Sequence, residues 1–247
     1  MPAFSMTDAT ILIHDQDMSG QSNQVALAAE AEALEDTTFR SGGWRSRVAG
    51  LRSVSLDVSG FWDPAPDEAT FAEIIAGSMG RAVTVSPGND EGGIAYIFRG
   101  GRFTYSQFGD IGALAPFSLN MMNTNREGLL RGAYLKRATD DNGTAENVTA
   151  TGVAGSAGVQ LPAVASGEFL YATFHVISAG TTITASLQSD DANTFASATD
   201  RITFGPITAE GGTWGTRVAG PITDTWYRLN VSAITGTFNV ACAVGIG

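Results

Sequence analysis

The stretch Thr37–Asp63 reads TTFRSGGWRSRVAGLRSVSLDVSGFWD and predicts a loop that leads into a strand. Its first part, residues 37–50, is punctuated by Gly and Ser, which favour turns, and it carries Arg40, Arg45 and Arg47. From Leu51 to Phe61 apolar and polar residues alternate, which is typical of a strand with one buried face. A basic loop beside a half-buried strand, in an acidic chain, indicates self-assembly more than chemistry.

The composition is that of a folded, acidic protein built mainly from β-structure. The chain has 247 residues, 43% of them hydrophobic and 16% charged, so extensive disorder is not expected. Its 30 glycines among many Thr and Val residues suit short strands joined by tight turns. The formal net charge of −11 argues against a protein that grips nucleic acid by its phosphates. It fits either a surface that nucleic acid slides past or simple solubility.

Neither a disulfide framework nor a membrane segment is expected. Cys242 is the only cysteine, so it cannot form an intramolecular disulfide, and its strand-like surroundings predict a small core residue. The N-terminus lacks the basic start and the long apolar run of a signal peptide. No run approaches the ~20 apolar residues of a membrane-spanning helix.

The chain outside this stretch predicts strands and a single helix. Strands are expected at 10–14 and at 25–35, although the second also has the Ala and Glu content of a helix. Asp67 is expected to cap a helix over 68–76 that ends near Gly77. Its apolar face would comprise Phe71, Ile74 and Ile75. A meander of strands would follow at 82–85, 94–98, 102–107, 116–123 and 129–136.

A shift in composition predicts two domains. Residues 1–138 would form the first β domain, and 139–165 would be a linker or would hold a weak first strand at 146–151. Residues 166–247 predict a second β-sandwich, Ig-like or jelly-roll-like, because turns recur every ~8–12 residues. Its expected core is Phe174, Leu187, Ile202, Phe204, Trp226, Leu229 and Val240.

The sequence offers no credible catalytic or metal-binding set. His14, His175 and one cysteine do not supply the three or four ligands of a zinc site. Residues 19–22 (SGQS) superficially resemble a hydrolase nucleophile turn, but His14 is too near in sequence to suggest a separate base-bearing loop. Acidic pairs could hold Ca²⁺ or could be solvated turn residues: Asp15 and Asp17, Asp140 and Asp141, and Asp190 and Asp191. We therefore expect no enzyme activity, no metal and no cofactor.

Trp214 is the candidate for a sugar contact. It lies between Gly212 and Gly215, and an exposed aromatic side chain on a β-sandwich can stack on a sugar ring. Trp226, in the same half of the chain, is interpreted as a core residue. A glycan-binding module is therefore one alternative for the C-terminal half.

The order of the elements over residues 8–137 resembles the major tail (tail tube) proteins of long, non-contractile-tailed bacteriophages. The residues that carry the resemblance are Thr37, Thr38, Phe39, Gly50, Leu51, Leu56, Ser59, Gly60, Phe61 and Asp63, with a later run of Phe103, Thr104, Tyr105, Gly109, Gly112 and 115–119. The C-terminal half resembles, more weakly, the β-sandwich modules appended to phage structural proteins.

The resemblance implies a structural virion protein, assembled in the host cytoplasm, that forms the tail tube. Tail tube proteins stack as rings, usually hexameric, whose inner wall is a closed β-barrel through which DNA passes. The expected partners are further copies and other tail proteins (tape measure, tail terminator and distal tail), without specific DNA binding and without a membrane. An acidic wall would keep phosphates from sticking, and Arg40, Trp44, Arg45 and Arg47 would meet acidic residues of a neighbour.

Three alternatives accompany this interpretation. A two-domain chain could form trimeric rings if both halves contribute to the barrel. A capsid decoration protein, or another accessory virion protein, could use a similar sandwich. A glycan-binding β-sandwich on the virion surface is the third.

Overall fold

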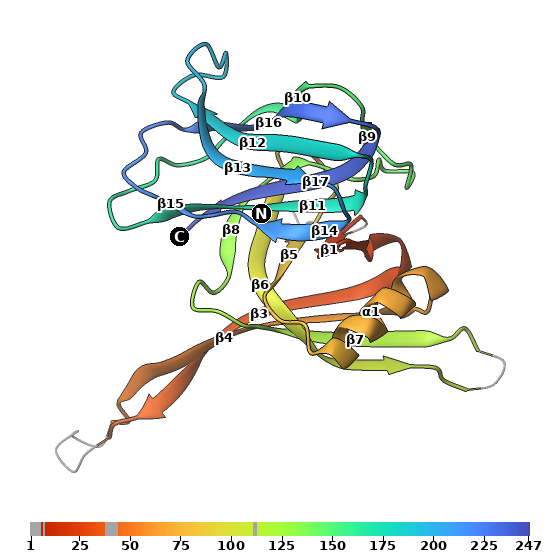
Figure 1. The fold of residues 1–247 in the computed structure, drawn as a ribbon. Coiled ribbons are helices and arrows are strands. Elements are labelled where there is room, and N and C mark those ends of the chain that lie inside the picture. Colours follow the sequence, from red (N-terminus) through yellow and green to blue (C-terminus); the bar gives the residue numbers. More distant parts are fainter. Residues whose placement is uncertain (1–5, 7, 38–43, 111–112) are drawn as a thin grey trace.

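The computed structural model describes residues 6, 8–37, 44–110 and 113–247, and this part is antiparallel β-structure with one α-helix (Figure 1). The predicted mainly-β fold is confirmed. The N-terminal half contains β1 (Thr10–Ile13), β2 (Gln16–Asp17), the 3-10 turn η1 (Ser19–Gln21), β3 (Ser22–Glu35), β4 (Arg47–Phe61), α1 (Pro64–Ala76), β5 (Arg81–Ser86), β6 (Ile94–Gln107), β7 (Pro116–Asn123) and β8 (Leu130–Lys136). The C-terminal half contains β9 (Asn147–Val148), β10 (Gly152–Gln160), β11 (Phe169–Ser178), β12 (Thr182–Asp190), β13 (Thr199–Ile207), β14 (Gly211–Trp214), β15 (Val218–Ala219), β16 (Trp226–Thr235) and β17 (Phe238–Ile246).

The N-terminal half is a sandwich of two sheet segments that share β6. One segment runs β3-β4-β7-β6 and the other runs β6-β5-β1-β2. The alternation predicted for β4 is present from Val54 to Phe61, where every second residue is buried. The core between the segments consists of Ile11, Ile13, Met18, Val54, Leu56, Val58, Val83, Val85, Phe98, Phe117, Leu119 and Met121.

The C-terminal half is a second sandwich. Strands β14-β11-β17 form one layer of this sandwich, and the four-stranded sheet β10-β16-β12-β13 forms the other layer. Phe174 of β11 stacks on Phe204 of β13 with ring centroids 5.1 Å apart. Six of the seven predicted core residues are buried. The exception is Trp226, which is half-buried while Tyr227 is fully buried, because successive strand residues point to opposite faces.

One continuous sheet joins the two halves. Strand β17 pairs with β8, so the path runs β14-β11-β17-β8-β6-β5-β1-β2. Gly132 of β8 lies opposite Gly245 of β17, and a side chain at Gly132 would overlap the carbonyl of Val244. Side chains from both halves fill the joint, among them Leu12, Ile97, Leu130, Tyr134, Tyr171, Ala241 and Ala243. The division within 139–165 stays a prediction, and that stretch contains β9 and the nine-residue β10.

The loop predicted over residues 37–50 is shorter than expected. Strand β4 begins at Arg47, and its first residues pair with the end of β3, with Arg47 opposite Glu35 and Val48 opposite Leu34. Cross-strand pairing therefore extends the hairpin by four residues that local composition assigned to the loop.

The single helix begins earlier than predicted. It starts at Pro64, because proline fits the first helical turn, so Asp67 is not its cap. The Asp67 carboxylate instead accepts hydrogen bonds from Tyr105 and Gln107 of β6, at 2.7 and 2.6 Å. Gly77, with φ +62°, follows the end of the helix as predicted. Within the described residues, no helix is long and apolar enough to cross a membrane.

Candidate assembly surfaces

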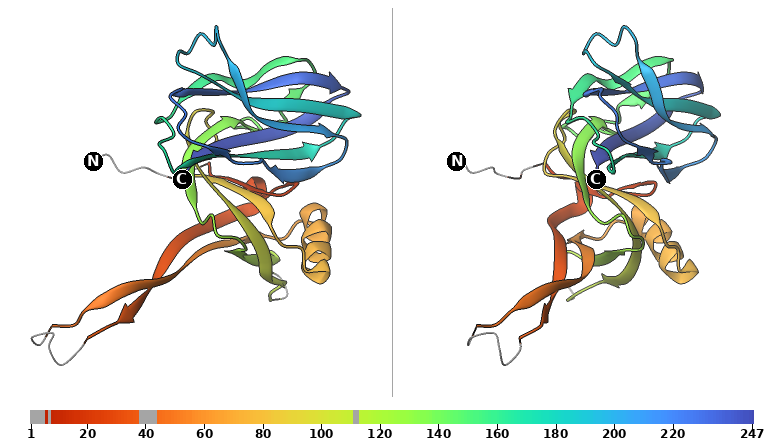
Figure 2. Two further views of the ribbon diagram at one scale, coloured as in Figure 1. Left: turned by 60° about the vertical axis from the view of Figure 1, so that its left-hand side comes forward. Right: turned by 90° about the vertical axis from the view of Figure 1, so that its left-hand side faces the viewer.

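The hairpin of β3 and β4 projects from the N-terminal sandwich as an arm, which we define as residues 30–37 and 44–53 (Figures 1 and 2). Strand β4 pairs with β7 only from Ser55 to Phe61, so in the arm the two described strands pair with each other alone. At ~3.3 Å per residue, residues 47–53 carry the arm roughly 23 Å away from the body. A two-stranded ribbon is at best marginally stable in water, so a partner surface is expected.

The two strands of the arm carry opposite charge. The β3 side holds four acidic residues, Glu30, Glu32, Glu35 and Asp36, and the β4 side holds Arg45, Arg47 and Arg52. All seven are exposed. The ion pairs found among the described residues do not join these two rows. Each edge of the ribbon therefore offers unpaired backbone groups together with charge of one sign.

The predicted interface residues lie at the distal end of the arm, where the structure describes them. Trp44 is 82% exposed, and Arg45 and Arg47 are exposed beside it. Arg40 lies outside the described residues. Leu51, assigned to an apolar strand face, is 83% exposed, because it lies on the arm where no second sheet covers it. The role of these residues in assembly stays a prediction.

The centre of the outward face of the β3-β4-β7-β6 sheet is small and polar, and the exposed side chains of Phe61 and Met122 lie at its margins on the same face. Two rows of residues in register share this centre, and we call these eight residues the polar wall: Gln24, Ser59, Ser118 and Ser106, then Ala26, Asp57, Asn120 and Thr104. Asn120 donates a hydrogen bond to Asp57 at 2.7 Å. Asp57 is the one charged residue of the wall, and none of its members is basic. A phosphate backbone finds no cation on this surface.

Sequence reasoning missed the polar wall. Its residues come from four strands between Gln24 and Asn120, and only their pairing brings them together. The available signal was the alternation of serine with aliphatic residues in β4, which showed that the face opposite the core is polar without showing its extent.

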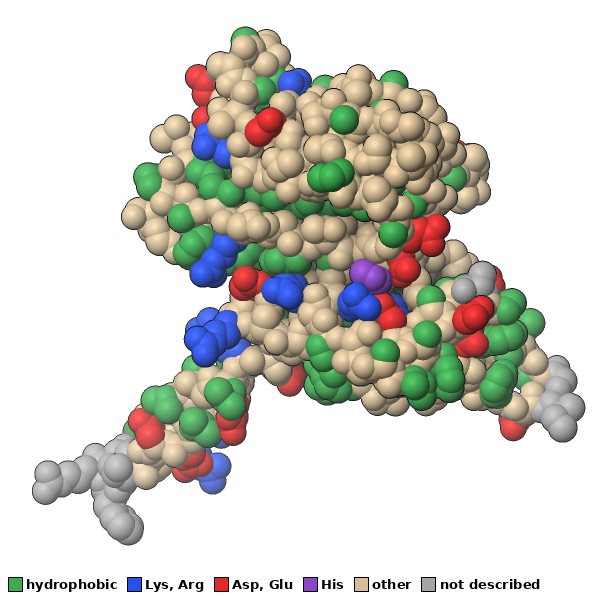
Figure 3. All heavy atoms as spheres, in the orientation of Figure 1, with side chains coloured by type: hydrophobic (Ala, Val, Ile, Leu, Met, Phe, Trp, Pro, Cys, Tyr) green, Lys and Arg blue, Asp and Glu red, His purple; other side chains and the backbone are tan. Residues whose placement is uncertain are grey.

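Helix α1 turns a polar side inward and an apolar side outward. Thr70 is fully buried and donates to Gln16 Oε1 at 2.8 Å. On the opposite side Phe71 is 55% and Ile75 is 72% exposed, and Met79, just beyond the helix, is 52% exposed. We call these three residues the apolar stripe; Figure 3 shows green side chains gathered over this part of the molecule. Of the predicted apolar face, Phe71 and Ile75 therefore point outward, and Ile74 is half-buried.

Buried charges hold the inner side of α1. Glu73 pairs with Arg81, with Nε to Oε1 at 3.0 Å, and with the guanidinium of Arg102. Arg102 is 5% exposed, and its burial lowers the pKa of its guanidinium while Glu73 opposes that shift. Gln16 Oε1 accepts a further hydrogen bond from Arg102 at 2.8 Å. These contacts fix the helix against the sheet through polar interactions.

The same cluster contains the one grouping of described residues that could hold a metal ion. His14, Asp15 and Glu73 bring potential ligand atoms within 4.8 Å of one another. Two guanidinium groups already contact the Glu73 carboxylate, and His14 Nδ1 accepts a hydrogen bond from Gly212 N at 2.7 Å. Because Glu73 faces two guanidinium groups and His14 is engaged by Gly212, the grouping carries no metal assignment.

The second histidine and the serine turn have structural partners. His175 is fully buried, with Nδ1 2.7 Å from the carbonyl of His14 and Nε2 2.9 Å from Thr84 Oγ1. Burial lowers the pKa of His175 to about 4. Ser19 Oγ donates to Asp17 at 2.5 Å and accepts from Ile11 N at 3.0 Å. A serine nucleophile needs an imidazole at hydrogen-bond distance from its hydroxyl, where Ser19 has Asp17 instead, so this turn has no catalytic geometry.

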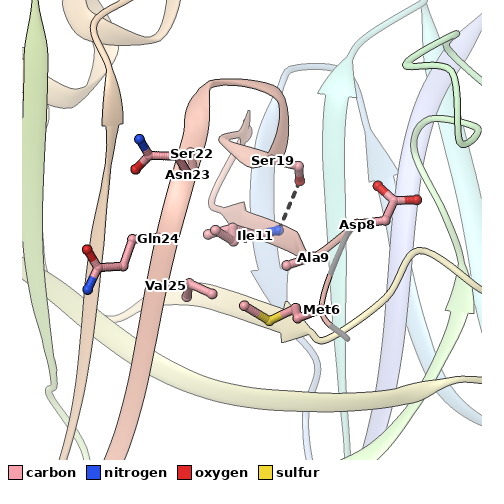
Figure 4. Close-up of a pocket in the computed structure, with 9 residues that line it drawn as sticks. All are labelled: Met6, Asp8, Ala9, Ile11, Ser19, Ser22, Asn23, Gln24 and Val25. Carbon is pink, nitrogen blue, oxygen red and sulfur yellow. Dashed lines mark hydrogen bonds between the residues drawn. The ribbon is translucent and has the colours of Figure 1, made fainter. Parts of the chain in front are cut away.

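The hollow beside this turn is small (Figure 4). Its volume is about 210 Å³, and it lies between the described N-terminal residues and the start of β3. Asp8 is its one titratable lining residue. Ligand sites usually enclose about 300–1,000 Å³ with several convergent polar groups, so this hollow is not a substrate site.

Trp214, the candidate sugar contact, is half-buried. Its ring packs against Tyr171 with centroids 5.9 Å apart, and its indole nitrogen is buried. Two of the other loop acids accept hydrogen bonds within their own turns: Asp140 accepts from the backbone of Asn142 and Thr144, and Asp190 accepts from Ser197. Sugar binding at Trp214 stays a prediction.

Comparison with known proteins gives structural likenesses alone. No family model matches the chain, and no curated protein matches it. It is similar to a chain of the virion of a native gene transfer agent particle, with 21% identity and a TM-score of 0.44 over 51% of this chain and 98% of that one.

Two further likenesses involve SPP1. The tail tube of SPP1 is 12% identical with a TM-score of 0.41, over 53% of this chain and 80% of that chain. A further similar structure is the SPP1 Dit protein, described as a paradigm of the hub adsorption apparatus in phages that infect Gram-positive bacteria. It is 12% identical with a TM-score of 0.33, over 97% of this chain and 99% of that chain. With TM-scores below 0.5, these likenesses carry no functional assignment.

Proposed function

We propose that this chain is a structural protein of a phage-like tail, which assembles with copies of itself into stacked rings that form a conduit for DNA. The observation that carries the proposal is the arm, which leaves the sandwich as a ribbon with two free edges of opposite charge. Monomeric proteins usually blunt or cover such edges. Here the edge of β3 in one copy would pair with the edge of β4 in the next.

The charges favour head-to-tail addition. Pairing β3 with β3 would place Glu30, Glu32 and Glu35 against their own copies, whereas pairing β3 with β4 places them against arginines. Such complementarity sets partner choice and register more than affinity. A contact between two unlike surfaces closes into a ring when the rotation allows it, and the resemblance of the sequence favours six copies over three.

The polar wall supports a role as the lining of the conduit. It lies on the sheet that continues into the arm, and along β3 the same face carries Ala26 and Glu30. Nucleic-acid binding depends on Lys and Arg contacts to phosphate, which these residues cannot make. A wall of small polar and acidic residues lets DNA pass without being held, and the formal charge of −11 acts in the same direction.

The test reverses the charge of the basic edge. Arg45→Glu with Arg47→Glu should leave the monomer folded, since both side chains are exposed, and should stop ring or tube formation. Negative-stain microscopy and sedimentation measure assembly, and circular dichroism measures folding. A charge-matched control, Arg131→Glu with Arg217→Glu, changes two exposed arginines outside the arm and should still assemble.

Each other outcome identifies an alternative. Tubes from the arm double variant would contradict the edge-pairing model. Discrete monomers or trimers from the unmodified chain under every condition would favour a capsid decoration protein. A sugar-dependent change in tryptophan fluorescence that Trp214→Ala removes would favour a glycan-binding module.

A further inference from the structure

We propose that the apolar stripe of α1 is covered by the distal arm of a second copy of this chain. The proposal rests on the head-to-tail assembly proposed above and names a contact that edge pairing alone does not require. Edge pairing uses the backbone of the ribbon and its charged side chains, so the apolar side chains on the faces of its described part stay available for a second surface.

Exposed large apolar side chains concentrate in two places among the described residues. Four lie on the arm, and seven lie on or around α1 and the facing ends of β6 and β7 (Figure 3). From residue 139 onward, Val153 is the one such side chain. The arm set is Leu34, Trp44, Val48 and Leu51, and the α1 set is Phe61, Phe71, Ile75, Met79, Phe103, Phe108 and Leu114.

This distribution limits what can cover α1. The described part of the C-terminal half offers Val153 alone for such a contact, whereas the arm offers four large apolar side chains. Within one chain the two sets cannot meet, because the arm and α1 lie on opposite sides of the N-terminal sandwich (Figures 1 and 2). The contact must therefore join two copies.

Charge selects the arm over a second α1. Residues 61–79 contain four acidic residues and no Lys or Arg, whereas residues 44–52 contain three arginines and no acidic residue. Two helices packed stripe to stripe would bring two acidic surfaces together without a cation between them, which like charges disfavour. The arm brings Arg45 toward Glu68 instead, and both side chains are exposed.

The two surfaces also match in chemistry, since both present large apolar side chains. Phe71 and Ile75 are four residues apart, so they form one ridge along the helix. Trp44 and Leu51 are the most exposed large apolar side chains of the arm, at 82% and 83%. Trp and Arg beside each other are typical of the residues that dominate binding at interfaces.

Disulfide trapping tests the contact directly. Cys242 is fully buried, so engineered cysteines would be the accessible thiols. Copies with Ser46→Cys, next to Trp44, are mixed with copies with Ala72→Cys, next to Phe71, and oxidised; both positions are exposed, and the apolar side chains stay intact. We expect crosslinked dimers on non-reducing gels, at least tenfold above a matched mixture in which Val153→Cys replaces Ala72→Cys.

The outcomes separate this inference from the proposed function. Rings or tubes that form without crosslinks above the control would overturn the α1 contact and leave the tail role standing. Crosslinked dimers without rings would support the contact and contradict the ring. Copies that neither associate nor crosslink at any concentration would overturn both.

A second variant tests the energetics of the stripe. Phe71→Gln with Ile75→Gln should leave the monomer folded, because both side chains are already exposed, and should weaken self-association at least tenfold. Val153→Gln is the control, since it changes an exposed apolar residue elsewhere. Unchanged association of the double variant in sedimentation would overturn the inference.

Discussion

Replacing Glu73 by glutamine is expected to destabilise the folded chain by about 3–5 kcal/mol, the cost of leaving a buried charge without its partner. Glu73 is 12% exposed and pairs with Arg81 and with Arg102, whose side chain is 1% exposed. Two unit charges 4 Å apart interact by about 4 kcal/mol at an effective dielectric constant of 20. The Arg81 side chain is 30% exposed, so solvent screens its share, and the loss comes mainly from Arg102.

Urea denaturation, followed by circular dichroism and tryptophan fluorescence, measures this loss. Glu68→Gln removes a carboxylate from the exposed side of the same helix and should change the free energy of unfolding by less than about 0.5 kcal/mol. In the double variant Glu73→Gln with Arg102→Met, the buried guanidinium is removed together with its carboxylate partner, so at least half of the lost stability should return.

Two results would refute the reasoning about this cluster. A loss below about 1 kcal/mol for Glu73→Gln would mean that Arg102 does not depend on this carboxylate, given that breaking a buried pair usually costs several times more. A double variant no more stable than Glu73→Gln alone would mean that the loss comes from packing, not from the unpaired guanidinium.

Three further predictions concern pH, a glycine and the polar wall. Burial lowers the pKa of His175 to about 4 from its ordinary 6.5, so the folded chain binds fewer protons than the unfolded chain. Stability should be complete above pH 6.5 and fall towards pH 4 by up to about 3 kcal/mol; His14, whose pKa is lowered by burial and by Arg81, adds to this slope. Urea midpoints across this range check it, and a His175→Gln variant with the same slope would contradict it. Gly155→Ala should cost about 1–3 kcal/mol in unfolding free energy, because φ is +81° and the new methyl would meet the Leu135 carbonyl; an unchanged urea midpoint would rule this out. Asp57→Lys with Asn120→Lys should still assemble but retain DNA at low salt in a filter assay, and absence of retention would argue against the wall as the lining.

Short-range pattern predicted much of the fold. The alternation of Val54, Leu56 and Val58 was enough to identify the buried face of β4, because the pleat of a strand places every second residue on one side. The ambiguous Ala- and Glu-rich stretch was correctly interpreted as the strand β3. Its helical propensity is weak beside the hydrogen bonds that β4 supplies along its whole length.

Other elements could not be predicted from the sequence, because the contacts that determine them involve residues far away along the chain. Strand β10 reads GVAGSAGVQ, without a large side chain, and its Gly155 passes so close to β8 that no side chain would fit. Asp67 is of a residue type that often caps helices, but Tyr105 and Gln107 of the later strand β6 donate hydrogen bonds to its carboxylate. The arginines at 45 and 47 were recognisable as unusual in an acidic chain, whereas the free edges beside them were not.

The sequence by itself determined the β-rich class, the acidic balance, the existence and end of the helix and the alternation along β4, because these depend on neighbouring residues. Tertiary structure alone decided that α1 faces outward with its apolar stripe, since Arg81 and Arg102 pair with Glu73 on its inner side. It also decided that the hairpin of β3 and β4 extends beyond the last residue that pairs with β7, so that its end projects as an arm. Both outcomes depend on which distant strands pair and where that pairing stops, and periodicity within one segment carries no information about either.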